Sequence, residues 1–97
     1  RIVLLWNRQF PQGQTSWPMS GGDGMWSATP ASNFRGELSI SFSEDECETW
    51  SPPVVIARRD KGEVCYPYLF EPEPGLFWIG AHRFGLKMRL RACDLAH

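Results

Sequence analysis

Residues 37–56 decide the fold of this chain, and they read Glu-Leu-Ser-Ile-Ser-Phe-Ser-Glu-Asp-Glu-Cys-Glu-Thr-Trp-Ser-Pro-Pro-Val-Val-Ile. At the start of the stretch, Leu38, Ile40 and Phe42 alternate with serines. Successive side chains of a β-strand point to opposite faces of a sheet, so this pattern predicts a half-buried strand. A polar turn and a second apolar run follow, and the whole stretch is therefore predicted to form a β-hairpin.

The turn of this hairpin carries side chains that can close it. Ser43 and Asp45 lie two positions apart, and the side-chain oxygens of such residues can accept hydrogen bonds from backbone N–H groups of their own turn. Trp50 follows them and is expected to give the turn a large apolar anchor.

These residues resemble the Asp-box, the Ser-x-Asp-x-Gly-x-Thr-Trp hairpin at the outer edge of β-propeller blades in sialidases and their relatives. The match consists of Ser43, Asp45, Thr49 and Trp50. Cys47 stands where the family usually has Gly, and if the turn needs a positive φ there, a Cβ costs about 1–2 kcal/mol. The resemblance implies a peripheral folding device whose residues touch no ligand.

Length and charge exclude several classes of function. A chain of 97 residues forms at most one small domain and buries only about 60–65% of its unfolded surface, so a large enzyme core is excluded. The formal charge is −1 with both signs interspersed, so no basic face is expected to recruit nucleic acid or anionic lipid. The longest apolar runs are far too short to span a bilayer.

Cysteines and histidines give no pattern of a metal or catalytic site. Cys47, Cys65 and Cys93 form neither a Cys-x-x-Cys motif nor a Cys/His cluster, which argues against a disulfide framework and a zinc site. His82 and His97 have no Ser or Cys partner at a recognisable spacing, so a hydrolase triad is unsupported. No cofactor is expected.

The first third of the chain combines one strand with a long loop. Residues 1–7 are an apolar run of strand length, which predicts a strand buried on both faces. Residues 8–35 are rich in Gly, Pro, Ser, Gln and Asn, which is loop chemistry, although loops beyond about 15 residues are uncommon in compact domains. Five apolar residues favour an ordered loop draped over a rim, with a solvent-exposed excursion as the alternative: Trp17, Met19, Met25, Trp26 and Phe34.

Three further strands are predicted after the hairpin. The first places Tyr66, Tyr68 and Phe70 on one face. It also contains Pro67, which cannot donate to a ladder, so this strand is expected at a sheet edge or beside a cavity. The other two strands lie at residues 76–81 and 87–93.

The two halves of the chain echo each other, because residues 3–8 and 77–83 are both apolar strands that end in a polar group and Arg. Repeated units of several short strands suggest propeller blades. We therefore predict an all-β fold that is a fragment of a β-propeller. Residues 1–57 are expected to form one incomplete blade with the long loop 8–35, and residues 64–94 the start of the next. Such a pair would leave apolar side chains bare, among them Trp6, Phe77 and Trp78.

The similarity to sialidase-like propellers extends over roughly residues 33–97. The family carries a Tyr-(Ser/Pro)-x-Leu/Met-x-Glu strand, a Gly-containing turn and a buried aromatic strand, and the counterparts here are residues 66–71, 74–75 and 76–81. The chain is thus similar to the C-terminal part of the catalytic domain. This resemblance implies a six-bladed propeller and an exo-α-sialidase type of glycoside hydrolase, which removes a terminal acidic sugar.

Two site residues follow from the resemblance. Tyr66 matches the nucleophile, and a neutral phenol suits a substrate that carries its own carboxylate beside the reacting carbon. A phenol with an ordinary pKa of about 10 is inert, so a neighbouring Glu must take its proton, and Glu71 matches a structural position instead. Arg35 matches one of three arginines that bind the sugar carboxylate, a task for which a planar guanidinium is suited. The residues alone leave two alternatives open, a Tyr66 ring packed beside Tyr68 and a solvated Arg35.

The remaining machinery of the family is expected outside this chain. The acid/base Asp and the first carboxylate-binding Arg of such enzymes lie in earlier blades, so the isolated 97 residues are expected to be inactive. The chain opens inside a strand pattern without an initiator Met or a leader, and is expected to be a piece of a longer polypeptide. Typical family members are secreted or periplasmic, but the sequence itself assigns no compartment.

The sequence is compatible with three functions. The first is the glycosidase, with a carbohydrate and the remaining propeller blades as its partners. The second is a non-catalytic Asp-box propeller that binds glycan or protein. The third is an autonomous small β domain with an accidental Asp-box match.

Overall fold

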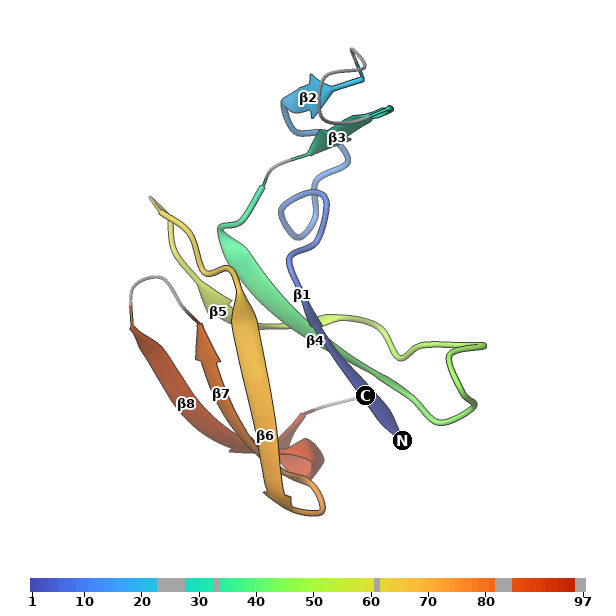
Figure 1. The fold of residues 1–97 in the computed structure, drawn as a ribbon, viewed down its shortest axis with the longest axis vertical. Helices are drawn as coiled ribbons and strands as arrows, with labels where there is room; N and C mark the ends of the chain where they lie inside the picture. Colours follow the sequence, from blue (N-terminus) through green and yellow to red (C-terminus); the bar gives the residue numbers. More distant parts are fainter. Residues whose placement is uncertain (23–27, 33, 61, 82–84, 96–97) are drawn as a thin grey trace.

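The structure is a computed structural model, and it describes residues 1–22, 28–32, 34–60, 62–81 and 85–95. These residues form strands in three antiparallel sheets and one short 3₁₀ turn, so the predicted all-β fold is confirmed (Figure 1). The elements are β1 (Ile2–Trp6), β2 (Met19–Gly21), β3 (Pro30–Ser32), β4 (Glu37–Ser43), β5 (Val54–Arg58), β6 (Pro67–Glu73), β7 (Leu76–Ala81), β8 (Leu86–Arg91) and η1 (Ala92–Asp94). Several residues considered above lie outside the described residues: Met25, Trp26, His82, Arg83 and His97.

The predicted hairpin forms most of the first sheet. β4 pairs antiparallel with β5 on one side and with β1 on the other, which gives the strand order β1-β4-β5. Leu5 lies opposite Ile40, and Ile40 lies opposite Val54, so one face of the sheet collects large apolar side chains. A bulge between Leu38 and Ser39 shifts the β4–β5 register near the start of β4.

β4 is buried on both faces, which makes the prediction of a half-buried strand wrong. Leu38 and Ile40 are fully buried, but so are the intervening serines, with Ser39 at 0% and Ser41 at 2% exposure. Small side chains in a central strand are covered by larger side chains on the flanking strands. Trp6 of β1, for example, donates its indole Nε1–H to Ser41 Oγ at 3.4 Å.

β1, in contrast to β4, is exposed on one face, so the prediction that it is buried on both faces is also wrong. Within the described residues it pairs with β4 alone, as an edge strand. Val3 and Leu5 pack against the core, whereas Ile2 and Leu4 point to the other face and are 41% and 38% exposed.

The second sheet is a meander of β6, β7 and β8 in sequence order, which confirms the three strands predicted after the hairpin. β6 lies at the sheet edge, as expected for a strand that contains Pro67. Glu71 Oε2 accepts a hydrogen bond from the Gly75 N–H at 2.7 Å and so caps the β6–β7 turn. The Ala92 N–H of η1 donates to Gly75 O at 2.8 Å, which ties the end of the second sheet to the same turn.

The two three-stranded sheets pack against each other through β4 and β7 (Figure 1). The rings of Phe42 and Phe77 lie 5.9 Å apart between centroids. Phe77 is fully buried, so the prediction of its exposure is wrong, whereas Trp78 on the opposite face is 49% exposed, as predicted. The buried core consists of Leu38, Ile40, Phe42, Val64, Phe77, Ile79 and Ala92.

Part of the predicted loop 8–35 is itself a small sheet. β2 and β3 pair antiparallel, and Figure 1 shows this pair of strands beyond the end of β1 and the start of β4, away from both larger sheets. At its base the rings of Trp17 and Phe34 are 4.6 Å apart, so two of the predicted anchors do contact each other. This geometry corresponds to the excursion rather than to a loop draped over a rim, and Trp17 and Met19 are 38% and 45% exposed.

Candidate functional site

A cavity of about 370 Å³ opens where the start of β4 meets the end of β1 and the start of β6. Three segments that are far apart in the sequence contribute to it, and they come from both larger sheets. Its lining residues are Leu5, Trp6, Asn7, Ser32, Phe34, Arg35, Cys65, Tyr66 and Pro67. The cavity thus contains both site residues predicted from the sequence.

Arg35 and Tyr66 are in contact at this cavity. The Arg35 guanidinium carbon lies over the Tyr66 ring, 5.0 Å from its centroid, which is a cation–π arrangement. Hydrogen bonding to the side chains of Tyr66 and Cys65 raises the pKa of Arg35 above its ordinary value. A guanidinium is charged at neutral pH even without such a shift, and Arg35 is the cation that the cavity offers to an anionic group.

Tyr66 is set apart from the other aromatic residues of its segment. Its φ is +54°, a left-handed value, and β6 begins one residue later. Because this residue breaks the alternation, Tyr66 lines the cavity while Tyr68 and Phe70 line a different surface of the sheet. The prediction that all three share one face is wrong, and so is the alternative of a Tyr66 ring packed beside Tyr68.

Two residues that precede Tyr66 were not picked out by the sequence. Cys65 is buried at 1% exposure, lines the cavity and donates its thiol to Glu63 Oε2 at 3.7 Å. Glu63 thus holds a carboxylate close to the cavity wall. Glu71, in contrast, is used at the β6–β7 turn, which agrees with the structural position expected for it.

Asn7 joins the segments that carry the two site residues. Its side-chain Nδ2 donates to Glu37 O at 2.7 Å and to Val64 O at 2.9 Å. In addition, the Val64 N–H donates to Arg35 O at 2.7 Å. The sequence signal for Asn7 was a polar residue directly after an apolar strand, a position that alone does not identify its partners.

The residues that resemble an Asp-box lie at the other end of β4, where they close the β4–β5 turn. Ser43 Oγ donates to Asp45 Oδ1 at 2.9 Å and accepts the Cys47 N–H at 2.8 Å. Asp45 also accepts both the backbone N–H and the hydroxyl of Thr49. These bonds, first of all the one from the Thr49 hydroxyl, lower the pKa of Asp45 below its ordinary value. The predicted local hydrogen bonding of the turn is confirmed.

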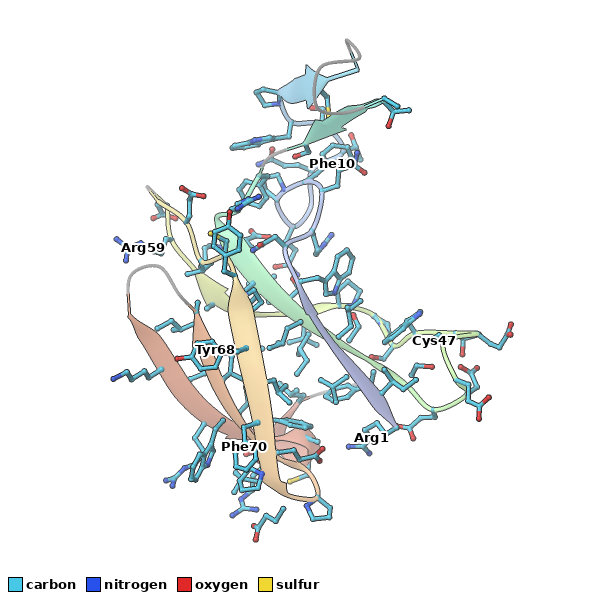
Figure 2. All side chains as sticks on the ribbon, viewed as in Figure 1. Arg1, Phe10, Cys47, Arg59, Tyr68 and Phe70 are labelled. Carbon is cyan, nitrogen blue, oxygen red and sulfur yellow. The ribbon has the colours of Figure 1, made fainter. Side chains whose placement is uncertain are left out.

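The backbone of this turn is left-handed where the family pattern has Gly. Cys47 has a φ of +75°, and Glu46 before it has +59°. Trp50 is 39% exposed and is a weaker anchor than predicted. The bond that closes the hairpin involves Ser51, whose N–H donates to Phe42 O at 2.8 Å while its hydroxyl accepts the Phe42 N–H at 2.9 Å. In Figure 2, Cys47 marks the tip of this turn and Arg59 lies toward the opposite end of the sheet.

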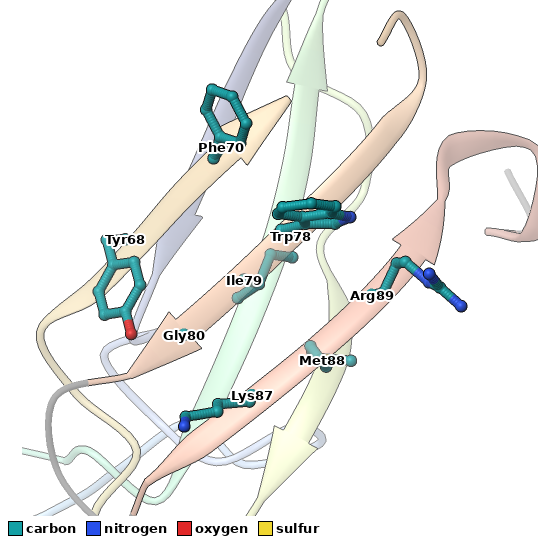
Figure 3. A pocket seen from close by; sticks show the side chains of 8 residues that line it. All are labelled: Tyr68, Phe70, Trp78, Ile79, Gly80, Lys87, Met88 and Arg89. Carbon is teal, nitrogen blue, oxygen red and sulfur yellow. The ribbon is translucent and has the colours of Figure 1, made fainter. Parts of the chain in front are cut away.

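A second candidate surface is the outer face of the sheet β6-β7-β8, where Figure 3 shows three aromatic side chains beside two cationic ones. Tyr68, Phe70 and Trp78 are 61%, 58% and 49% exposed, and the Phe70 and Trp78 rings meet edge to face with centroids 5.9 Å apart. Lys87 and Arg89 flank them from β8. We call these five residues the aromatic face.

The described residues contain no group of three or more His, Cys, Asp or Glu side chains that could hold a metal ion. They also include no helix that is long and apolar enough to cross a membrane. Comparisons with protein-family models, with curated proteins and with solved structures found no match.

Proposed function

We propose that this chain is part of a sialidase-like β-propeller glycosidase, in which Tyr66 is the nucleophile and Arg35 binds the carboxylate of a terminal acidic sugar. The observation that carries the proposal is the contact between these two side chains, with the guanidinium carbon 5.0 Å from the ring centroid at one cavity. In a sialoside the carboxylate is attached to the reacting carbon. A nucleophile and a carboxylate-binding cation must therefore be neighbours.

The arrangement of the sheets supports the propeller. The Asp-box joins β4 to β5, which are the last two strands of the first sheet, and Tyr66 precedes the edge strand of the second. Tyr66 would then stand at the innermost strand of its blade. The two sheets pack face to face, as successive blades do, and their outer faces carry exposed apolar side chains against which further blades would pack.

The chemistry assigned to Tyr66 is nucleophilic catalysis in two steps. The phenol oxygen attacks the anomeric carbon while a carboxylate base takes the phenol proton, and the glycosidic bond breaks as the leaving oxygen is protonated by the acid/base. Water then replaces Tyr66 at the same carbon, which restores the enzyme and releases the sugar. Arg35 holds the substrate carboxylate through charge-assisted hydrogen bonds during both steps.

The test uses the intact polypeptide with a fluorogenic sialoside. We expect Tyr66→Phe to lower kcat by a factor on the order of 10³ or more, because the phenol oxygen forms the covalent bond. Tyr68→Phe is the matched control, since Tyr68 lies on the aromatic face and not at the cavity; it should leave turnover unchanged. Turnover that survives Tyr66→Phe would eliminate the nucleophile assignment.

The aromatic face favours a second candidate, a propeller that binds glycan or protein without turning it over. Exposed Tyr and Trp rings beside cationic side chains are typical of binding surfaces. Under this candidate the wild-type polypeptide would bind its ligand without releasing the fluorophore, and Trp78→Ala would weaken that binding.

A further inference from the structure

Three segments meet at the cavity, and specific hydrogen bonds fix how they lie relative to one another. Arg35 precedes β4 in the first sheet, whereas Tyr66 precedes β6 in the second. Among the described strands, none of one larger sheet pairs with a strand of the other, so the ladder of neither sheet sets the distance between these residues. The backbone bond from the Val64 N–H to Arg35 O, at 2.7 Å, is one direct link.

Asn7 supplies a second link through a single side-chain amide. Its Nδ2 bonds Glu37 O, two residues after Arg35, and Val64 O, two residues before Tyr66. A carboxamide nitrogen carries two hydrogens, so both donors are used, one on each segment. Asn7 thereby holds the flanks of both site residues at the same time.

The backbone of Tyr66 makes this link important. A left-handed φ of +54° costs a residue with a Cβ about 1–2 kcal/mol, and such a conformation persists only where its surroundings fix it. The carbonyl of Val64 and the N–H of Val64 are both held, by Asn7 and by Arg35 respectively. If one of these bonds is lost, Tyr66 can relax toward an extended φ, which would turn its ring away from Arg35.

We propose that Asn7 is a positioning residue that keeps the Tyr66 ring against the Arg35 guanidinium. This inference deepens the proposed function, since it concerns the same cavity, but the geometry that it predicts is measurable without any turnover. The amide of Asn7 acts on the backbone at both flanks, and the two site residues take their relative position from it.

The experiment measures the ring-current shift that Tyr66 imposes on the side-chain protons of Arg35 by NMR, with Tyr66→Leu as the zero reference. We expect Asn7→Ala to abolish more than half of this shift while the methyl signals of Leu38 and Ile40 in the core stay in place. Gln12→Ala is the matched control. The Gln12 side chain accepts a hydrogen bond from Arg58 at the same end of β4, while the Gln12 backbone N–H bonds Glu37 Oε1, so the variant removes a side-chain bond that does not involve the segment of Tyr66 and the shift should persist.

Asn7→Asp is the second variant, because it keeps the size of the side chain and faces two carbonyl oxygens with a carboxylate. We expect the Arg35 shift to be small at neutral pH and to recover in part when acid protonates the new carboxyl, which can then donate one bond. A full shift in both variants would overturn the proposal. Collapse of the core signals together with the shift in both variants would also overturn it, since Asn7 would then support the whole fold. Failure of the glycosidase proposal would show as absent sialoside turnover with the Asn7 effect intact.

Discussion

The two ends of β4 are built in different ways. At the Ser43 end, the side-chain bonds of the β4–β5 turn join residues two and four positions apart in the sequence. At the Glu37 end, the two bonds from Asn7 span 30 and 57 positions. One end is a self-contained turn, while the other exists only after both sheets have come together.

Both ends contain residues with left-handed φ values, but different kinds of contacts stabilise them. Cys47 and Glu46 adopt left-handed φ values within the turn that Ser43 and Asp45 close. Tyr66 adopts its left-handed φ between segments that are held from outside, by Asn7 and Arg35. The conformation at the Ser43 end should therefore depend on the residues of its own turn. The conformation at the Glu37 end, beside the cavity, should also depend on residues that are distant in the sequence.

Of the substitutions that distinguish the two ends of β4, Arg35→Lys in the intact polypeptide is expected to have the largest effect, and this effect is on kcat/KM. Lysine cannot make the two parallel bonds of a guanidinium to a carboxylate, so kcat/KM on a sialoside should fall by about 10²-fold. The free energy of unfolding should change little, since Arg35 is not part of the core. Arg89→Lys on the aromatic face is the control and should have no effect on kinetics. Equal losses in both variants would argue against a specific role for Arg35.

A loss of about 2 kcal/mol in the free energy of unfolding is expected for Ser43→Ala, measured by urea denaturation. Ser43 is 1% exposed and its hydroxyl bonds both Asp45 and the Cys47 N–H, so its removal deletes two hydrogen bonds of the turn, each worth about 1 kcal/mol. Ser39→Ala is the matched control on the same strand. Ser39 Oγ is buried and has no hydrogen-bond partner among the residues that the structure describes, so its removal should be neutral or stabilising. Similar losses in both variants would contradict the hydrogen bonds as the cause.

A gain of about 1 kcal/mol is expected for Cys47→Gly, because glycine adopts a φ of +75° without strain from a Cβ. In a thermal melt this corresponds to a rise of about 4–8 °C for a domain of this size. Cys93→Gly provides the comparison. Cys93 is also exposed but is not among the residues with positive φ, so this change should be slightly destabilising. A decrease in stability for Cys47→Gly would refute strain at the turn.

The smallest effect is a pH dependence of the free energy of unfolding that arises from Asp45. The pKa of Asp45 is lowered in the folded state, chiefly by the hydrogen bond from the Thr49 hydroxyl. The unfolded chain therefore binds a proton first as the pH falls below about 4. The contribution of Asp45 to stability is fully present above that pH and is lost as the pH falls through the folded-state pKa. The difference between the urea midpoints of the wild type and Asp45→Asn should be full at pH 6 and should shrink as the pH falls below about 4; a constant difference would contradict this.

Local features of the fold were predictable from the sequence because their causes lie within a few residues. The hairpin at residues 37–56, the hydrogen bonds of Ser43 and Asp45, and the edge position of the strand with Pro67 all follow from short patterns. The strands after the hairpin were also predictable, because alternating side chains and turn residues mark them in the sequence.

Burial was not predictable in the same way, because it depends on which strands become neighbours. β1 is an uninterrupted apolar run, yet Ile2 and Leu4 face outward from an edge strand, while the serines of β4 are buried in a central one. Position in the sheet, and not the polarity pattern, decides this difference.

The candidate site was predictable only in its residue types. The resemblance pointed to Tyr66 and Arg35, and the structure places both at one cavity. Nothing in the sequence indicates that Tyr66 leaves the alternation of its strand through a left-handed φ, or that Asn7 connects the two flanking segments. Both features arise from tertiary contacts.

The contact between Gly80 and Tyr68 determines how flat the aromatic face is. A β-carbon at position 80 would lie 2.3 Å from the Tyr68 ring, so the phenol ring fills the space that a side chain on β7 would otherwise take. The glycine lets the Tyr68 ring of the neighbouring strand lie flat across β7. The substitution Gly80→Ala would displace the Tyr68 ring away from the sheet. The aromatic face would then be less flat, and a further sheet or partner could pack against it less closely.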